Sequence, residues 1–140
     1  RIERSGGANF QQRAELITPR QKLLKSAVVM ANELKAAGLI VFTSNGNMAR
    51  YAAWMRPDFS PIFAICEYES VADSLTLNWA ITPFHIPFRA TDPNENIRKA
   101  LAHLTENKRL AKGQTVVIVS QIVTGESTVP VDGIQMRTVP

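Results

Sequence analysis

The fold of this chain is decided by the stretch Leu39-Ile40-Val41-Phe42-Thr43-Ser44-Asn45-Gly46-Asn47-Met48. Four consecutive apolar residues, 39–42, are typical of a strand that is buried on both faces, as in a parallel sheet. The polar residues 43–47 indicate a loop, and apolar side chains then recur at helical spacing over residues 48–55. A buried strand that leads through a short loop into a helix is the repeating unit of an α/β protein.

The same alternation of helices and short apolar runs extends on both sides of this stretch. Thr18 and Pro19 predict a helix start, with Thr as the N-cap, and Gly38 predicts the end of that helix. Further strands are expected at 62–66, 84–86, 116–119 and 134–139, and further helices after caps at Ser70 and Asp92. The sequence therefore predicts an α/β fold, a three-layer α/β/α sandwich with a mostly parallel sheet of about five strands and an antiparallel last strand.

The length and the charge of the chain limit what it can be. Its 140 residues suffice for one domain, which we place at residues 18–140, after a linker at residues 1–17. The formal net charge of +4 comes entirely from residues 1–25, which hold six basic and two acidic side chains, so we expect no nucleic-acid partner. No apolar run approaches the roughly 20 residues that a membrane span requires. The single Cys66 cannot form an internal disulfide, which fits a reducing, cytoplasmic compartment.

The loop at residues 43–47 is the most informative candidate site. In α/β sheets, ligands bind beyond the carboxyl ends of the strands, where loops lead into helix N-termini. Hydroxyl and amide side chains here adjoin a glycine at the positive end of a helix, which suits an anion such as phosphate. The alternative is that these side chains only cap the helix and turn the chain. The candidate residues are Thr43, Ser44, Asn45, Gly46, Asn47 and Met48.

The usual motifs for nucleotide binding and hydrolysis are missing from the sequence. It contains no G-x-x-x-x-G-K-[ST], no G-x-G-x-x-G after a strand and no G-x-S-x-G. His85 and His103 are separated by a predicted strand and helix, so we expect no metal site. Cys66 is interpreted as a small apolar residue of a strand, and Glu67 and Glu69 as solvated acids of the loop after it. We therefore expect no catalytic residue.

Five segments of the sequence, taken in order, carry a resemblance to a known family. They are Thr43–Ala49, Ala49-Arg50 with Arg56-Pro57, Pro61–Ala64, Leu77–Pro83 and Lys112–Val119. These segments resemble, in turn, the T-x-S-G-x-[ST]-A loop, the A-[RK]…[RK]-[FY]-[RK]-P stretch, the P-I-x-A strand, the L-x-[WF]-G-V-x-P segment and the K-G-D-x-V-V-V strand of the pyruvate kinase C-terminal domain. The resemblance runs from about residue 20 to the end of the chain.

This resemblance implies a regulatory and oligomerisation domain. In the family, phosphoryl transfer from phosphoenolpyruvate to ADP in glycolysis takes place in a preceding barrel, to which the Mg²⁺ and K⁺ ions also belong. The implied partners are that barrel, whose last helix residues 1–4 resemble, and the other subunits of a homotetramer. The resemblance also implies a phosphorylated effector, a sugar phosphate such as fructose 1,6-bisphosphate or a nucleotide monophosphate. Its phosphate would be held at Thr43, Ser44, Asn45 and Met48.

Several positions depart from the family pattern. Met48 replaces a hydroxyl residue and Asn45 replaces a serine. The Gly-rich effector loop of the family, G-x-x-x-G-x-T-N, is replaced by residues 121–128, where Glu126 would repel a bisphosphate at close range. Candidates for a second effector contact there are Gly125, Ser127 and Thr128. Two other hypotheses remain open: a stand-alone protein that binds a small anion with the same fold, and a small phosphatase or other hydrolase that uses Glu67 or Cys66.

Overall fold

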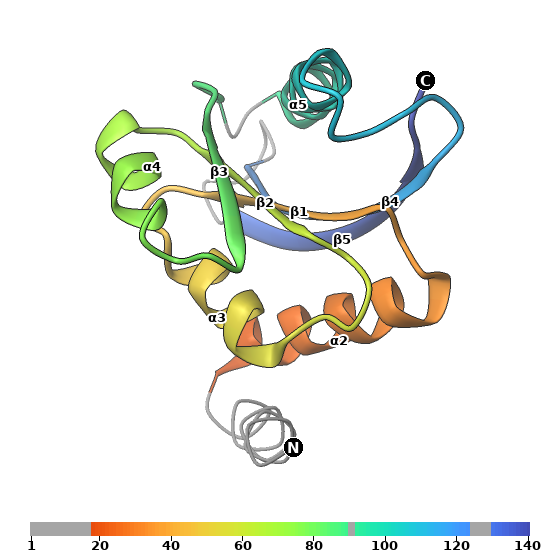
Figure 1. Ribbon diagram of the computed structural model, residues 1–140. Helices are drawn as coiled ribbons and strands as arrows, with labels where there is room; N and C mark the ends of the chain where they lie inside the picture. The colour runs from red at the N-terminus through yellow and green to blue at the C-terminus, as the bar shows by residue number, and fades with distance from the viewer. Residues whose placement is uncertain (1–17, 90–91, 124–129) are drawn as a thin grey trace.

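The helices and strands follow the alternation that the sequence predicts (Figure 1). The computed structural model describes residues 18–89, 92–123 and 130–140. The linker prediction for residues 1–17 lies outside this part of the chain. In chain order the elements are α2 (Pro19–Leu34), β1 (Gly38–Thr43), α3 (Asn47–Met55), β2 (Ile62–Cys66), α4 (Glu69–Leu75), β3 (Ile81–His85), α5 (Pro93–Glu106), β4 (Thr115–Val123) and β5 (Pro130–Thr138).

The five strands form one sheet in the order β3-β2-β1-β4-β5. β1 lies in the middle and pairs in parallel with both β2 and β4, so that Val41 has Ala64 on one side and Val119 on the other. β3 continues the parallel pairing beyond β2, whereas β5 runs antiparallel to β4. The predicted sheet, mostly parallel with an antiparallel last strand, is confirmed.

Helices cover both faces of the sheet, and each face has its own apolar core. Successive residues of a strand point to opposite faces, so β1 contributes Leu39 and Val41 to one core and Ile40 to the other. The first core lies under α2, α3 and α4. The second lies under α5, whose Ile97 and Leu104 are almost completely buried. Figure 1 shows these layers, with α5 on one side of the sheet and α2 and α3 on the other.

The end of the first helix differs from the prediction. α2 ends at Leu34, and Lys35, with φ of 48°, takes the left-handed position that was expected at Gly38. Gly38 is instead the first residue of β1, where a Cβ atom would lie 2.6 Å from Cε2 of Phe63. The glycine is therefore required for close packing against an aromatic ring and not for ending the helix.

Two smaller boundaries also differ from the prediction. α4 begins after Tyr68 and not after the expected cap Ser70, and no side chain caps its first turn. β3 starts at Ile81 and includes Pro83, which an edge strand tolerates because one side of its backbone is unpaired. The predicted caps Thr18 and Asp92 are both confirmed, since their side chains accept hydrogen bonds from the amides of Gln21 and Glu95.

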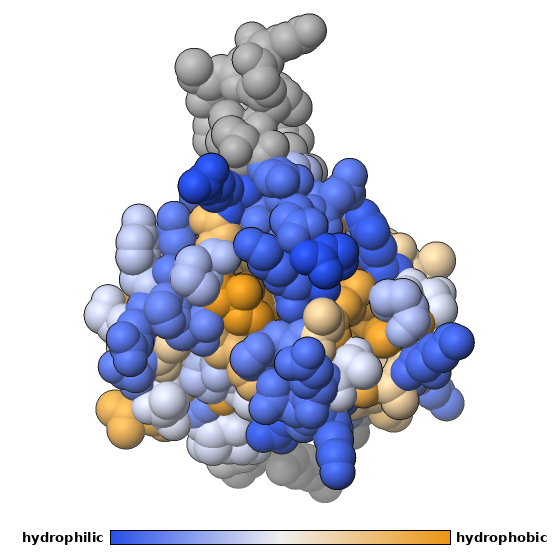
Figure 2. Space-filling model, turned by 90° about the horizontal axis from the view of Figure 1, so that it is seen from above, coloured by the Kyte–Doolittle hydropathy of each residue, from blue (hydrophilic) through white to orange (hydrophobic). Residues whose placement is uncertain are grey.

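The surface over α5 is mainly hydrophilic, with small apolar areas between the polar side chains (Figure 2). This agrees with the alternation of buried and exposed positions along α5. Within the described ranges, none of the helices combines the length and apolarity that crossing a membrane requires.

Candidate functional site

The order of the strands fixes where a ligand can bind. From β1 the chain proceeds through β2 to β3 on one side of the sheet, whereas β4 and β5 lie on the other side of β1. β1 and β4 therefore form the switch point of the sheet, beyond whose carboxyl ends ligands bind in α/β proteins. A cavity of about 140 Å³ lies at this place. Its polar lining includes Thr43 at the end of β1, Ser44 and Asn45 after it, and Ser120 of β4.

The loop between β1 and α3 is held in shape by its own side chains. Gly46 is the N-cap of α3 and has φ of 89°, a left-handed conformation that favours glycine. Thr43 Oγ1 accepts a hydrogen bond of 2.7 Å from the Gly46 amide, and Asn45 Oδ1 accepts one of 2.9 Å from the Asn47 amide. Two of the predicted binding residues therefore use an oxygen to shape the loop. No hydrogen bond among the described residues uses the Thr43 hydroxyl hydrogen or the Asn45 amide group, so both can donate to a ligand.

The N-terminus of α3 is the electropositive feature of the cavity. The first amides of a helix have no partner within the helix, and they make this end favourable for a negative charge. The N-cap Gly46 makes no side-chain capping bond. The amides of Gly46 and Asn47 already donate to side chains of the loop. The next amide along the helix is that of Met48, a residue that lines the cavity.

A buried serine of β4 has a side chain that strand alternation places on the α5 side of the sheet, opposite α3. Ser120 lies on the cavity and is 8% exposed. Among the residues that the structure describes, its Oγ has no hydrogen-bond partner. A buried hydroxyl without a partner costs about 1–3 kcal/mol of stability, so such groups call for a physical explanation. Less than 1 Å² of this oxygen is accessible, so it presents no donor to the cavity.

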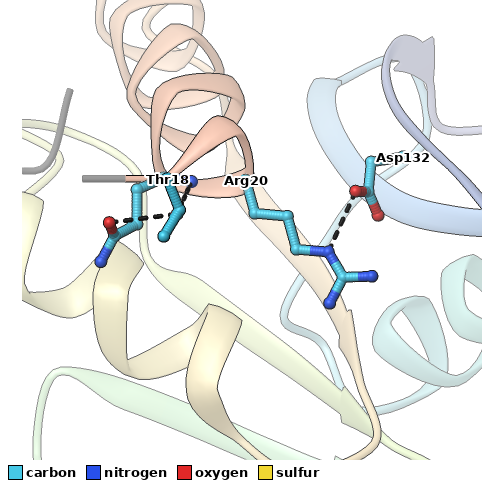
Figure 3. A network of polar contacts seen from close by, with 4 residues as sticks. Thr18, Arg20 and Asp132 are labelled. Atoms are coloured by element: carbon cyan, nitrogen blue, oxygen red, sulfur yellow. Dashed lines mark hydrogen bonds and ion pairs between the residues drawn. The ribbon is translucent and has the colours of Figure 1, made fainter. Parts of the chain in front are cut away.

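Among the described residues, the charged side chains that line the cavity are one guanidinium and two carboxylates. Arg20 Nε of α2 donates to Asp132 Oδ2 of β5 at 3.1 Å, a contact that joins residues 112 positions apart (Figure 3). Glu67 follows β2, and its Oε2 accepts a hydrogen bond of 2.8 Å from Ser44 Oγ. Arg50 of α3 donates to the Asn45 carbonyl oxygen and to Ser74. Counted over the part of the chain that the structure describes, the cavity thus combines a positive helix end with an excess of one negative side chain.

The structure separates the predicted site residues into three groups. Thr43, Ser44, Asn45 and Met48 line the cavity together. Gly46 and Asn47 shape the helix start behind them without lining it. The predicted second contact at Gly125, Ser127 and Thr128 lies outside the described residues.

The groups that the hydrolase hypothesis requires are not arranged for nucleophilic chemistry. Burial raises the pKa of the Cys66 thiol from its usual 9.0 to about 11, which keeps it protonated near neutral pH. The Glu67 carboxylate accepts a hydrogen bond from the Ser44 hydroxyl. His103 packs edge-on against Phe84, with ring centroids 5.2 Å apart. Over the described ranges, no group of three or more His, Cys, Asp or Glu side chains is placed to hold a metal ion.

Three polar residues of the described cavity lining were not predicted as site residues from the sequence. Ser120 follows the apolar run 116–119 directly, and a polar residue at the end of a buried strand is a signal that sequence reasoning can use. Arg20 and Asp132 have no such local signal. They meet only because α2 packs beside β4 and β5.

These features define an α/β domain with a small polar cavity at the switch point of its sheet, next to a helix N-terminus. Sequence comparison identifies the family: residues 21–130 match the family described as pyruvate kinase, alpha/beta domain. The chain therefore belongs to this family, as its sequence motifs indicate.

Known proteins with similar sequences are longer than this chain. It is 34% identical over 103 residues to pyruvate kinase isozyme A, chloroplastic, of Nicotiana tabacum, and 35% identical over 103 residues to the protein of that name from Ricinus communis. Each match covers 74% of the chain and 17% of the relative. Among solved structures, the chain is similar in fold to Cryptosporidium parvum pyruvate kinase in complex with ADP, with a TM-score of 0.75 and 21% identity. That match covers 89% of this chain and 24% of the other.

Proposed function

We propose that this chain is the C-terminal regulatory and oligomerisation domain of a pyruvate kinase. The family membership supports this proposal, as does the match to only 17% of the length of the tobacco and castor bean enzymes. Transfer of a phosphoryl group from phosphoenolpyruvate to ADP would then belong to the rest of the parent enzyme, together with the ions it needs. Pyruvate formation by the 140-residue chain alone would contradict the non-catalytic part of this proposal.

Within that role, we propose that the cavity binds a phosphorylated effector, a sugar phosphate or a nucleotide monophosphate. The observation that carries this proposal is the N-terminus of α3 at a cavity that Thr43 also lines. Two kinds of donor, the Thr43 hydroxyl and the helix amides, lie there for phosphate oxygens. Both come from rigid elements of the sheet and helix layers, so little ordering is needed on binding.

Thermal unfolding with added ligands tests the effector proposal. Fructose 6-phosphate, AMP and inorganic phosphate should each be titrated against the chain, since a ligand at 100 times its Kd adds about 2.7 kcal/mol of stability. Asn45→Asp should reduce the shift by adding a negative charge to the loop. If no phosphate compound shifts the transition of the wild-type chain, the loop only caps α3 and the effector proposal is wrong.

We propose that the subunit contact involves β5, an edge strand of nine residues. The outer side of an edge strand carries unpaired N–H and C=O groups that can pair with another chain. The Val139 amide donates to the Gln114 carbonyl, so the N–H groups of Val139 and Arg137 point toward β4 and that of Met136 points outward. Met136 is also 60% exposed.

The direction of these amides gives a selective test of the subunit contact. Met136→Pro removes an outward N–H and leaves the pairing of β4 with β5 intact, so it should yield a folded monomer in sedimentation analysis. Arg137→Pro is the matched control, because it removes an inward N–H and should lower the thermal midpoint instead. A wild-type chain that sediments as a monomer at millimolar concentration would argue against a contact through β5.

We also propose the cytoplasm as the compartment. Cys66 is a free, buried thiol, and free thiols persist in reducing compartments. Cell fractionation with an antibody against the chain would test this directly.

A further inference from the structure

The loop between β1 and α3 contains the pair Asn45-Gly46, the single place in the sequence where an asparagine precedes a glycine. This pair is prone to spontaneous deamidation, because glycine has no side chain that obstructs attack of its backbone nitrogen on the asparagine side chain. Asn45 is exposed, so water reaches its amide group. The structure shows the contacts of both reacting groups.

Two contacts of Asn45 favour the reaction. Asn45 Oδ1 accepts a hydrogen bond of 2.9 Å from the Asn47 amide. When a nucleophile adds to Cγ of Asn45, negative charge develops on this oxygen, and the Asn47 amide stabilises that charge as the donors of an oxyanion hole do. Arg50 Nη1 donates to the Asn45 backbone carbonyl oxygen at 3.4 Å, where negative charge accumulates when the Gly46 amide loses its hydrogen.

The nucleophile, in contrast, is restrained by Thr43. Gly46 is buried, and its amide donates to Thr43 Oγ1 in a hydrogen bond of 2.7 Å. The nitrogen must lose this hydrogen before it attacks, so the hydrogen bond has to break and a base from solvent has to reach it. Thr43 is 4% exposed and belongs to β1, which fixes the acceptor in the sheet. Attack therefore requires local opening of the loop.

We propose that Asn45 is a site of spontaneous deamidation and that the hydrogen bond to Thr43 sets its rate. The Gly46 nitrogen forms a bond to Cγ of Asn45 and closes a succinimide ring. The bond from Cγ to Nδ2 breaks, and the side-chain nitrogen leaves as ammonia with a proton equivalent to the one that the Gly46 nitrogen gives up. Water then opens the ring at either of its two carbonyl carbons, which yields aspartate or isoaspartate.

Both products change the charge of the loop. They place a new carboxylate next to Ser44, whose Oγ already donates to the Glu67 carboxylate at 2.8 Å. Isoaspartate also lengthens the backbone by one atom directly before Gly46, the N-cap of α3 with φ of 89°. Deamidation would thus alter the charge and the shape of this loop with time, and it needs no ligand.

The isoaspartate content at residue 45 measures the reaction, because an isoaspartyl methyltransferase detects this product and peptide mapping locates it. The folded wild-type chain should be aged at neutral pH beside Thr43→Val, which keeps the shape of the side chain and removes the acceptor. We expect Thr43→Val to form isoaspartate roughly twofold to tenfold faster, the factor that corresponds to the net free energy of one hydrogen bond. Thr43→Ser keeps the hydroxyl and should age like the wild type.

Two further variants separate loop opening from other causes. Asn45→Gln removes the reactive pair, so its isoaspartate content gives the background. Ser60→Ala removes a buried hydrogen bond to the Ala36 carbonyl oxygen, which lies at the amino ends of β1 and β2 and therefore at the opposite end of the sheet. It lowers the stability of the domain without touching the loop and should leave the rate at Asn45 unaltered. Urea titrations confirm that each variant folds.

The possible outcomes decide each part of the proposal. Equal rates for Thr43→Val and the wild type would overturn the role of Thr43. An equal acceleration by Ser60→Ala would do the same, because unfolding of the whole domain would then control the reaction. If Thr43→Val forms no isoaspartate at residue 45 while the urea-unfolded chain does, the folded loop does not react and the proposed site is wrong. No ligand enters these measurements, so their outcome is separate from that of the effector proposal.

Discussion

Two buried serines of this domain differ in one respect that can be measured. Ser60 is 6% exposed, and its Oγ donates to the Ala36 carbonyl oxygen at 2.8 Å. Ser120 is 8% exposed and has no partner among the described residues. Serine to alanine removes the same atom at both positions, so the comparison isolates the hydrogen bond. We expect the two substitutions to change stability in opposite directions.

The magnitudes follow from the contacts of each hydroxyl. Ser60→Ala loses a buried hydrogen bond and takes a donor from the Ala36 carbonyl, which should cost about 1–2 kcal/mol. Ser120→Ala removes an unsatisfied hydroxyl, and the relief of its desolvation is offset in part by lost contacts of the oxygen. It should therefore raise stability by between zero and about 1 kcal/mol. For 140 residues, 1 kcal/mol corresponds to roughly 3 °C in Tm.

Urea denaturation followed by circular dichroism measures both effects on a common baseline, provided that the slope of free energy against urea is unchanged. A loss of stability by Ser120→Ala as large as that of Ser60→Ala would refute the reasoning. It would mean that the Ser120 hydroxyl is satisfied in the folded chain.

Three further outcomes follow from the structure. Gly46→Ala should lower the unfolding free energy by about 1–2 kcal/mol in urea titrations, because φ is 89° and the added Cβ would lie 3.0 Å from Arg50 Nη1. Thr18→Ala should cost about 1 kcal/mol in the same assay, because the Gln21 amide loses its cap. The raised pKa of Cys66 means that the folded chain holds this proton more tightly than the unfolded chain. The contribution of the protonated thiol to the unfolding free energy is therefore fully present below pH 9 and is lost as the pH rises toward 11. Denaturation at each pH should show the unfolding free energy of the wild type falling by about 2 kcal/mol relative to that of Cys66→Ala.

The parts of the fold that were predictable from the sequence are those with strong local causes. The apolar runs 39–42, 62–66 and 116–119 are strands because each is buried on both faces of a parallel sheet. The caps Thr18 and Asp92 mark helix starts because their oxygens satisfy free amides of the first turn.

Other features depend on contacts between distant residues, and local patterns do not contain them. Gly38 resembles a helix stop, but the ring of Phe63 requires the glycine at that point, and Lys35 ends the helix instead. The candidate site likewise contains residues with a local sequence signal and residues that depend on contacts between distant segments. The loop at residues 43–48 has a local signature. Ser120 and Asp132 join it only because β4 lies beside β1 and β5 lies beside β4, and Arg20 joins it because α2 packs beside both of these strands.

The proposed effector cavity and the proposed subunit contact share two adjacent strands. Ser120 belongs to β4 and Asp132 to β5, and the two strands pair in continuous register from Thr115 beside Thr138 to Val123 beside Pro130. A ligand that attracts Arg20 away from Asp132 would act directly on the edge strand. Coupling between the two sites therefore needs no long chain of intermediate contacts. Because linkage is reciprocal, an effector that strengthens association through β5 must itself bind the associated form more tightly by the same factor.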